Sequence, residues 1–382
     1  MKPIPYGKQN ITEQDIQAVI ETLQSDYLTQ GPKIEEFEKK FADYIGCDYA
    51  VAVANGTAAL HLAAIALGVN KESKVISTPI TFAASANCIL YCGGSVDFVD
   101  INPETLLLDI DLLEKKLSNA PAETYHGIVV VDFAGMPVNL EKLKAIANKY
   151  HLWIIEDACH APGAYFTDSK DQKQFCGNAN FAELAVFSFH PVKHIACGEG
   201  GMITTNKKEL YEKLKMLRTH GITKDEKLLK ENHGGWYYEM QELGYNYRLT
   251  DFQAALGISQ LSTAAGRLER RREIAAIYDE AFKDMPLKVF PAQKRDAHAY
   301  HLYVIHTKKR KELYDHLRGR QIFCQVHYIP VHLQPFYQKK GFKKGMFPHA
   351  EAYYNGCLSL PMYSSLTDSE LNYVINSIKN FL

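Results

Sequence analysis

The chain alternates between two patterns of hydrophobic and polar residues. Apolar residues recur at helical spacing over about residues 13–24, 33–45 and 57–67. Short apolar runs that are typical of buried strands come later in the chain, at about residues 74–78, 95–99, 127–132 and 152–157. Buried strands alternating with helices predict an α/β fold with a mostly parallel sheet and crossover helices.

The pattern changes towards the C-terminus. One helical pattern runs over about residues 251–283 and ends before Pro286, because proline cannot continue a helix. Two further apolar runs and a final helical pattern predict a smaller α+β unit. We therefore expect a large domain over residues 1–285 and a small C-terminal domain over residues 286–382.

The polar segment of residues 221–243 interrupts the alternation of helices and strands. A loop of this length in a compact domain is usually functional, so we expect it to cover a site.

Composition narrows the class of protein. The chain has 382 residues, 46% of them hydrophobic, which is enough to bury a large core. Its formal net charge of −1 gives no support to a nucleic-acid partner or an anionic membrane surface. Eight irregularly spaced cysteines, an N-terminus without an apolar signal-peptide core and the lack of a membrane-length apolar stretch predict a cytoplasmic protein with reduced thiols.

Lys193 and Asp157 are the most informative candidates for chemistry. Most lysines are solvated, and an aspartate at a strand end often only caps a turn, so each residue alone is weak evidence. Together they fit pyridoxal 5′-phosphate (PLP). A primary amine can bond to the cofactor's aldehyde, and a carboxylate can keep the pyridine nitrogen protonated so that the ring accepts electrons. Asp157 ends an apolar run, where an open α/β sheet binds its ligand.

A phosphate site is predicted upstream of this pair. The apolar run of residues 50–54 turns through Gly56 into a helix rich in Ala and Leu. Free amides at a helix start bind phosphate, and Thr57 adds a hydroxyl beside them. Ser188, shortly before Lys193, supplies a second hydroxyl for the same group.

Several motifs, in this order, resemble the DegT/DnrJ/EryC1/StrS family of nucleotide-sugar aminotransferases. They are Asn55–Leu60, Thr78–Phe82, Glu156–Ala161, Phe187–Lys193, Gly198–Gly201 and Gly244–Asp251. The resemblance covers nearly the whole chain. It implies an aspartate-aminotransferase-like fold (PLP fold type I) with PLP as the cofactor.

The resemblance also implies a role for each matching residue. Lys193 would bond to the cofactor and move the proton between the cofactor carbon and the sugar carbon, and Asp157 would pair with the pyridine nitrogen. His160 would lie near the cofactor's phenolic oxygen, and Phe82 would stack on the ring. The phosphate would be held by Thr57, the Ala58 amide, Ser188 and, from the other subunit of a homodimer with shared active sites, Asn246.

Members of this family transfer an amine, usually from L-glutamate, to C3 or C4 of a keto sugar on a nucleotide diphosphate. Residues 27–31 and 325–330 look most like those of members that act at C4 of a UDP-linked 2-acetamido-2,6-dideoxy-4-keto-hexose, in pseudaminic acid biosynthesis. The corresponding substrate contacts would be Tyr6, Thr29, His327 and Tyr328. The Gly234–Tyr238 segment departs from that pattern, which leaves the sugar open.

Other interpretations remain. The main alternative is a C3- or C4-aminotransferase of the same fold that acts on another dTDP-, GDP- or UDP-keto sugar. A related dehydratase branch has histidine in place of Lys193, and a non-catalytic PLP-binding regulator would be expected to carry a nucleic-acid-binding module, which this sequence lacks.

Two further groups of residues have simpler interpretations. The pairs His190 with His194 and Cys88 with Cys92 lack further ligands at metal-site spacing, so we predict no metal centre. The basic run of residues 267–272 predicts a solvated helix face or a subunit contact.

Overall fold

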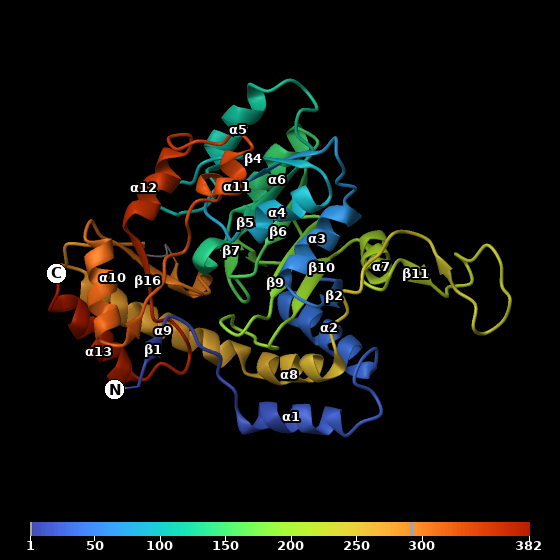
Figure 1. Cartoon of the computed structure of the whole chain (residues 1–382), viewed down its shortest axis with the longest axis horizontal. Helices are drawn as coiled ribbons and strands as arrows, with labels where there is room; N and C mark the ends of the chain where they lie inside the picture. The colour runs from blue at the N-terminus through green and yellow to red at the C-terminus, as the bar shows by residue number, and fades with distance from the viewer. Residues whose placement is uncertain (1, 291–293) are drawn as a thin grey trace.

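A seven-stranded sheet forms the centre of the computed structural model, which describes residues 2–290 and 294–382 (Figure 1). All its strands run in one direction except β10, which is antiparallel to both of its neighbours. In spatial order the strands are β2 (Tyr49–Val53), β10 (Gly201–Thr205), β9 (Leu184–Ser188), β6 (Trp153–Asp157), β5 (Gly127–Val131), β3 (Lys74–Ser77) and β4 (Ser95–Phe98). The predicted α/β fold with a mostly parallel sheet is confirmed.

Helices cover both faces of this sheet, because its strands are apolar on both sides. Strand β6 contributes side chains to both faces: Ile155 packs with one set of helices and Ile154 with the other. Side chains alternate along a strand, so Asp157 shares the face of Ile155, whereas Glu156 points to the opposite face. The helices on the Ile155 face are α3 (Gly56–Ala66), α4 (Ala84–Tyr91) and α7 (Lys208–Leu217), and those on the other face include α2 (Pro32–Ile45), α5 (Ile110–Ser118) and α6 (Leu140–Lys149).

A second hydrophobic core lies near both chain ends, which are close together in Figure 1. Its elements are β1 (Ile4–Pro5) paired in parallel with β15 (Ile322–Phe323), the antiparallel strands β13 (Lys288–Val289), β14 (Tyr303–His306) and β16 (Cys357–Leu360), and the helices α10 (Arg310–Gly319) and α13 (Asp368–Lys379). The shorter elements α11 (Pro335–Gln338), α12 (Pro348–Gly356), β7 (Tyr165–Thr167) and β8 (Lys173–Phe175) complete the chain. The domain boundary at residue 285 stays a prediction.

The helical pattern predicted over residues 251–283 is confirmed, but it forms two helices rather than one. The structure has α8 (Asp251–Ser262) and α9 (Ala264–Phe282), with α1 (Glu13–Leu23) packed along α8 (Figure 1). Thr263 between them leaves helical geometry at φ −111° and ψ 5°, and its hydroxyl donates to the carbonyl of Gln260. Within the described residues, no helix is both long and apolar enough to cross a membrane.

Arg271 on α9 corrects the interpretation of the basic run as a solvated face or subunit contact. Its guanidinium is buried and donates to the backbone carbonyls of Tyr300 and Met362. Burial lowers the pKa of Arg271 to about 10. This arginine therefore fastens α9 to the C-terminal core.

The segment of residues 221–243 forms an arm that projects from the body of the molecule (Figure 1). Its two short strands, β11 (Ile222–Thr223) and β12 (Glu239–Met240), pair antiparallel, and Trp236 between them is 74% exposed. None of its residues lines the cavity described below, and the expectation that it covers a site stays a prediction.

Candidate active site

A cavity of about 600 Å³ opens at the carboxyl edge of the sheet, where β6 ends at Asp157 and β9 ends at Ser188. Parallel strands bring their carboxyl ends to one edge, which is why residues far apart in sequence meet here. Ten of the predicted site residues line this cavity: Tyr6, Thr57, Ala58, Phe82, Asp157, His160, Ser188, Lys193, His327 and Tyr328.

The start of α3 forms an anion cradle, made by Gly56, Thr57 and Ser188. The first amides of a helix have no intrahelical acceptor, and they attract anions. The Ala58 amide, predicted to hold phosphate, donates instead to Oδ1 of Asn55 at 2.8 Å, which leaves the amides of Gly56 and Thr57 for an anion. A Cβ atom on Gly56 would lie 3.0 Å from Cβ of Ser188, so a larger residue here would displace Ser188.

Lys193 lies in the turn after β9 and is partly exposed to the cavity. Loss of hydration lowers the pKa of Lys193, while Cys159 and Asp157 act in the opposite direction. The lowered pKa enlarges the fraction of neutral amine, which is the form that attacks an aldehyde or takes up a proton.

Asp157 is held by donors on both carboxylate oxygens. Its Oδ2 accepts a hydrogen bond from Oγ of Ser85 at 2.6 Å, and its Oδ1 accepts one from the amide of Cys159 at 3.2 Å. Thr81 in turn lies 2.8 Å from the Ser85 hydroxyl. Sequence reasoning missed Ser85 and Thr81, although two hydroxyl residues four positions apart directly after a strand are a usable signal.

His160 is a neutral histidine, and a hydrogen bond from the backbone determines which ring nitrogen carries the proton. Its Nδ1 accepts the amide hydrogen of Ala134 at 3.3 Å, so the ring proton sits on Nε2, which lies 3.4 Å from the Tyr328 hydroxyl. Burial, followed by the nearby charge of Lys193, holds the pKa of His160 well below its usual range. His160 therefore offers a donor rather than a positive charge.

Two more histidines surround this group. The His301 ring lies 4.2 Å from that of His160, between centroids, and His301 lines the cavity although sequence reasoning missed it. Nδ1 of His327 lies 2.9 Å from the Ser359 hydroxyl, and burial lowers the pKa of His327 to about 3. Both rings are therefore neutral beside Lys193.

Thr29 and Asn246 lie outside the cavity of their own chain. Thr29 forms a bridge with Thr250, and Asn246 forms one with Thr219. Both side chains are exposed. The predicted contact of Thr29 with substrate and that of Asn246 with the phosphate of the other subunit stay predictions.

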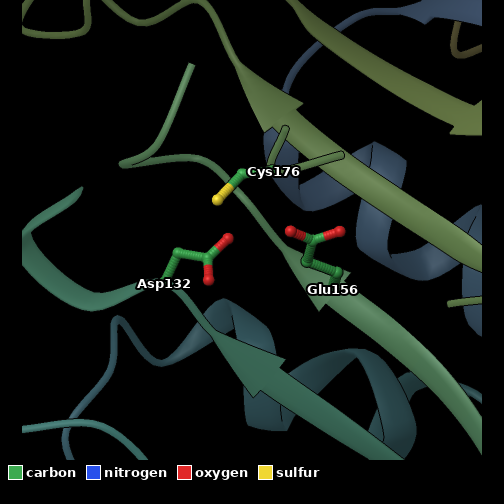
Figure 2. Close-up of side chains that lie close together, drawn as sticks. All are labelled: Asp132, Glu156 and Cys176. Carbon is green, nitrogen blue, oxygen red and sulfur yellow. The ribbon is translucent and has the colours of Figure 1, made fainter. Parts of the chain in front are cut away.

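A buried acidic cluster lies on the opposite face of β6 from Asp157. Figure 2 shows Asp132, which follows β5, facing Glu156 on β6 and the thiol of Cys176, and their polar atoms lie within 4.8 Å of one another. Metal ligands can show such spacing, but backbone amides already donate to this cluster. The Gly177 amide bonds both oxygens of Glu156 at 3.0 Å, and the Val138 amide bonds Asp132 at 2.8 Å.

Protonation accounts for this cluster without an ion. Burial raises the pKa of Asp132 to about 6, and burial together with Asp132 raises that of Glu156 well above its usual range. Two buried carboxyl groups this close disfavour a double negative charge, and both shifts favour a proton on the pair. The absence of a metal centre stays a prediction.

Comparison with known proteins identifies the family to which this chain belongs. A model of the DegT/DnrJ/EryC1/StrS aminotransferase family matches residues 9–379. The chain is 40% identical to the uncharacterized protein MJ1066 of Methanocaldococcus jannaschii, over 99% of this chain and 97% of that one. It is 37% identical, with the same coverage, to the UDP-4-amino-4,6-dideoxy-N-acetyl-beta-L-altrosamine transaminase of Campylobacter jejuni. It is 34% identical to the GDP-perosamine synthase of Escherichia coli O157:H7, over 100% and 99% of the two chains.

Solved structures match over the whole fold. A putative sugar aminotransferase of Streptococcus pneumoniae, Spr1654 in its PMP form, superposes with a TM-score of 0.90 at 30% identity, over 99% of this chain and 98% of that one. Helicobacter pylori PseC, an aminotransferase involved in the biosynthesis of pseudoaminic acid, superposes with a TM-score of 0.88 at 31% identity, over 99% of both chains.

Proposed function

Because the chain belongs to the DegT/DnrJ/EryC1/StrS family and is a PLP-dependent sugar aminotransferase, we propose that it aminates C4 of a UDP-linked 2-acetamido-2,6-dideoxy-4-keto-hexose. L-Glutamate is the proposed amino donor, and pseudaminic acid biosynthesis is the proposed pathway. The similarity to the C. jejuni transaminase over 99% of the chain carries this proposal.

The residues around the cavity fit PLP. The anion cradle at the start of α3 suits the cofactor's phosphate, and a side chain larger than glycine at position 56 would crowd it. Asp157 presents a carboxylate to the cavity for the ring nitrogen, and Lys193 presents an amine for the aldehyde. Phe82 is 61% exposed beside Tyr328 on the cavity wall, where a planar ring can stack.

When bound, PLP supplies an aldehyde that carries the amino group and a ring that accepts electrons from a substrate carbanion. In this proposal Asp157 keeps the ring nitrogen protonated, and the Ser85 hydroxyl holds Asp157 in place. Lys193 takes up and returns a proton at the reacting carbon, because its lowered pKa makes the neutral amine accessible. The Nε2 proton of His160 is available to a phenolic oxygen.

One specific alternative has support. The GDP-perosamine synthase is 34% identical to this chain, so a GDP-linked keto sugar is a second candidate substrate. Because the chain is an enzyme, the interpretation as a non-catalytic regulator is not kept.

The proposal includes a homodimer in which Asn246 of one subunit contacts the phosphate bound to the other. Its support is that Asn246 is exposed and does not line the cavity of its own chain. We also propose a cytoplasmic location, which agrees with eight free cysteines.

The test is a substrate screen with purified protein, L-glutamate and UDP-, dTDP- and GDP-linked 4-keto and 3-keto sugars. The proposal expects turnover with the UDP-linked 4-keto sugar, formation of 2-oxoglutarate, and an amine at C4 in the NMR spectrum of the product. Thr29→Ala should mainly raise KM and His327→Ala should mainly lower kcat, if these residues bind the substrate and place its keto carbon, respectively. A preference for a GDP- or dTDP-linked sugar, or an amine at C3, would overturn the substrate assignment.

A further inference from the structure

A chain of two hydroxyl groups lies behind Asp157. Ser85 is the second residue of α4, and its Oγ is 2.6 Å from Oδ2 of Asp157. Oγ1 of Thr81 is 2.8 Å from the same Ser85 oxygen. All three residues are buried, with exposed fractions of 2% for Thr81, 0% for Ser85 and 6% for Asp157.

The Asp157 carboxylate at the end of this chain determines the direction of both hydrogen bonds. An ionised carboxylate only accepts hydrogen bonds, and a serine hydroxyl has one hydrogen to donate. Ser85 therefore donates to Asp157, and its oxygen accepts the hydroxyl hydrogen of Thr81. Each hydroxyl is thus oriented by the next one, and the chain ends on the carboxylate.

A buried carboxylate keeps its charge only where donors replace the water that it has lost. The Cys159 amide supplies one donor to Asp157, and Ser85 supplies the shorter one. Behind the strand, the Asp132–Glu156 pair lies close enough for its charge to interact with that of Asp157. Ser85 therefore offsets an environment that otherwise disfavours a second negative charge.

We propose that Ser85, oriented by Thr81, is a positioning residue that fixes Asp157 as an ionised carboxylate directed at the cofactor's ring nitrogen. The inference rests on the proposed role of Asp157. Without the Ser85 hydroxyl, the carboxylate loses its shorter donor and its fixed direction, and it would hold a proton on the ring nitrogen less firmly. The ring then becomes neutral and accepts electrons less well.

The experiment uses Ser85→Ala holoenzyme loaded with cofactor that carries ¹⁵N at the ring nitrogen. The ¹⁵N chemical shift reports whether this nitrogen is protonated. In the variant it should move from the pyridinium value towards that of neutral pyridine. We expect kcat to fall about 10- to 100-fold, the effect of losing one hydrogen bond to a charged group, while KM for both substrates changes less than about threefold.

Two variants separate positioning from packing. Ser85→Thr keeps a hydroxyl and should restore the ¹⁵N shift and most of kcat. Ser77→Ala makes the same change at another fully buried serine, whose hydroxyl donates to the Val129 carbonyl away from the cavity, and should leave the shift unchanged. The proposal would be overturned if Ser85→Thr did not restore kcat and the ¹⁵N shift, or if Ser77→Ala changed them as Ser85→Ala does.

Asp157→Asn distinguishes the failure of this inference from the failure of the proposed function. If Asp157→Asn moves the ¹⁵N shift and Ser85→Ala does not, only the role of Ser85 is wrong. If Asp157→Asn changes neither the shift nor turnover, the role of Asp157 is wrong as well. Should Ser85→Ala not fold, Thr81→Val removes the donor that orients Ser85 at nearly constant volume. It should shift the ¹⁵N signal in the same direction by a smaller amount, and a wild-type spectrum would reject the hydroxyl chain.

Discussion

Gly56 and Ser188 approach so closely that a Cβ atom on Gly56 would lie 3.0 Å from Cβ of Ser188 and 3.3 Å from its hydroxyl oxygen. The two residues come from different strand ends, and their contact forms the wall of the anion cradle. The absence of a side chain at position 56 is therefore a requirement of the site rather than of the helix that begins there.

Gly56→Ala should weaken cofactor binding without weakening the fold. The added methyl group displaces Ser188 and removes one hydrogen bond to the phosphate, so the dissociation constant of PLP should rise about tenfold or more. Fluorescence titration of the apo-protein measures this constant. Gly266→Ala is the matched control, because its methyl group meets nothing within 4 Å in helix α9. Equal PLP affinity in Gly56→Ala and wild type would contradict the cradle.

Lys193→Ala should abolish both the covalent link to the cofactor and amino transfer. No other lysine lines the cavity, so no second amine is in place to bond to the aldehyde within the described residues. The absorbance of the bound cofactor and its resistance to dialysis after borohydride reduction report the link. Turnover should fall by several orders of magnitude. An Ala variant that still turns over at a substantial rate would show that another residue moves the proton.

Asn246→Ala should reduce cofactor retention, if this residue reaches the phosphate bound to a second subunit. Mixing Asn246→Ala protomers with Lys193→Ala protomers creates dimers in which one of the two sites has both residues intact. Such mixtures should recover activity, up to about half that of wild type per mixed dimer, because only one site is complete. Each variant alone, unmixed, is the control. Mixtures that recover nothing would place Asn246 in its own subunit's site or in no site.

Asp132→Asn should change the pH dependence of stability. The pKa of Asp132 in the folded protein is raised to about 6, above its unfolded value of about 3.9. A raised pKa means that the stabilising contribution is complete below about pH 4 and is lost as the pH rises through about 6. The variant has no carboxyl group at position 132, so it does not lose this stabilising contribution as the pH rises. Its free energy of unfolding relative to that of wild type should therefore increase by on the order of 1–3 kcal/mol between about pH 4 and pH 7.

Urea unfolding of both apo-proteins across this pH range measures that difference. The groups that face Asp132 are the Val138 amide, Glu156, Cys176 and Asp157, and the comparison with wild type leaves all of them in place. Asp296→Asn is the control: a hydrogen bond from Tyr165 lowers the pKa of exposed Asp296, so its contribution to stability changes only below about pH 4, and its difference from wild type should stay nearly constant over this range. A difference between Asp132→Asn and wild type that stays constant with pH would exclude the shared proton.

The sequence by itself determined the local elements and the residues with unusual chemistry. Hydrophobic spacing predicted α1, α2, α3 and the strand that ends in Asp157, because a period of 3.6 or a short apolar run reflects burial directly. Motif order predicted the family, and the match over residues 9–379 confirms it. The PLP cofactor was predicted from an amine and a carboxylate whose chemistry is specific.

Only the tertiary structure decided which groups surround those residues. Ser85, His301 and the Asp132–Glu156 pair are separated in sequence from what they contact, and no periodicity links a helix start to the end of a neighbouring strand. The break at Thr263 and the burial of Arg271 were missed for the same reason: both depend on what α9 packs against. Hydrogen bonds and protonation depend on distance and burial in space, whereas helix and strand patterns depend on spacing along the chain.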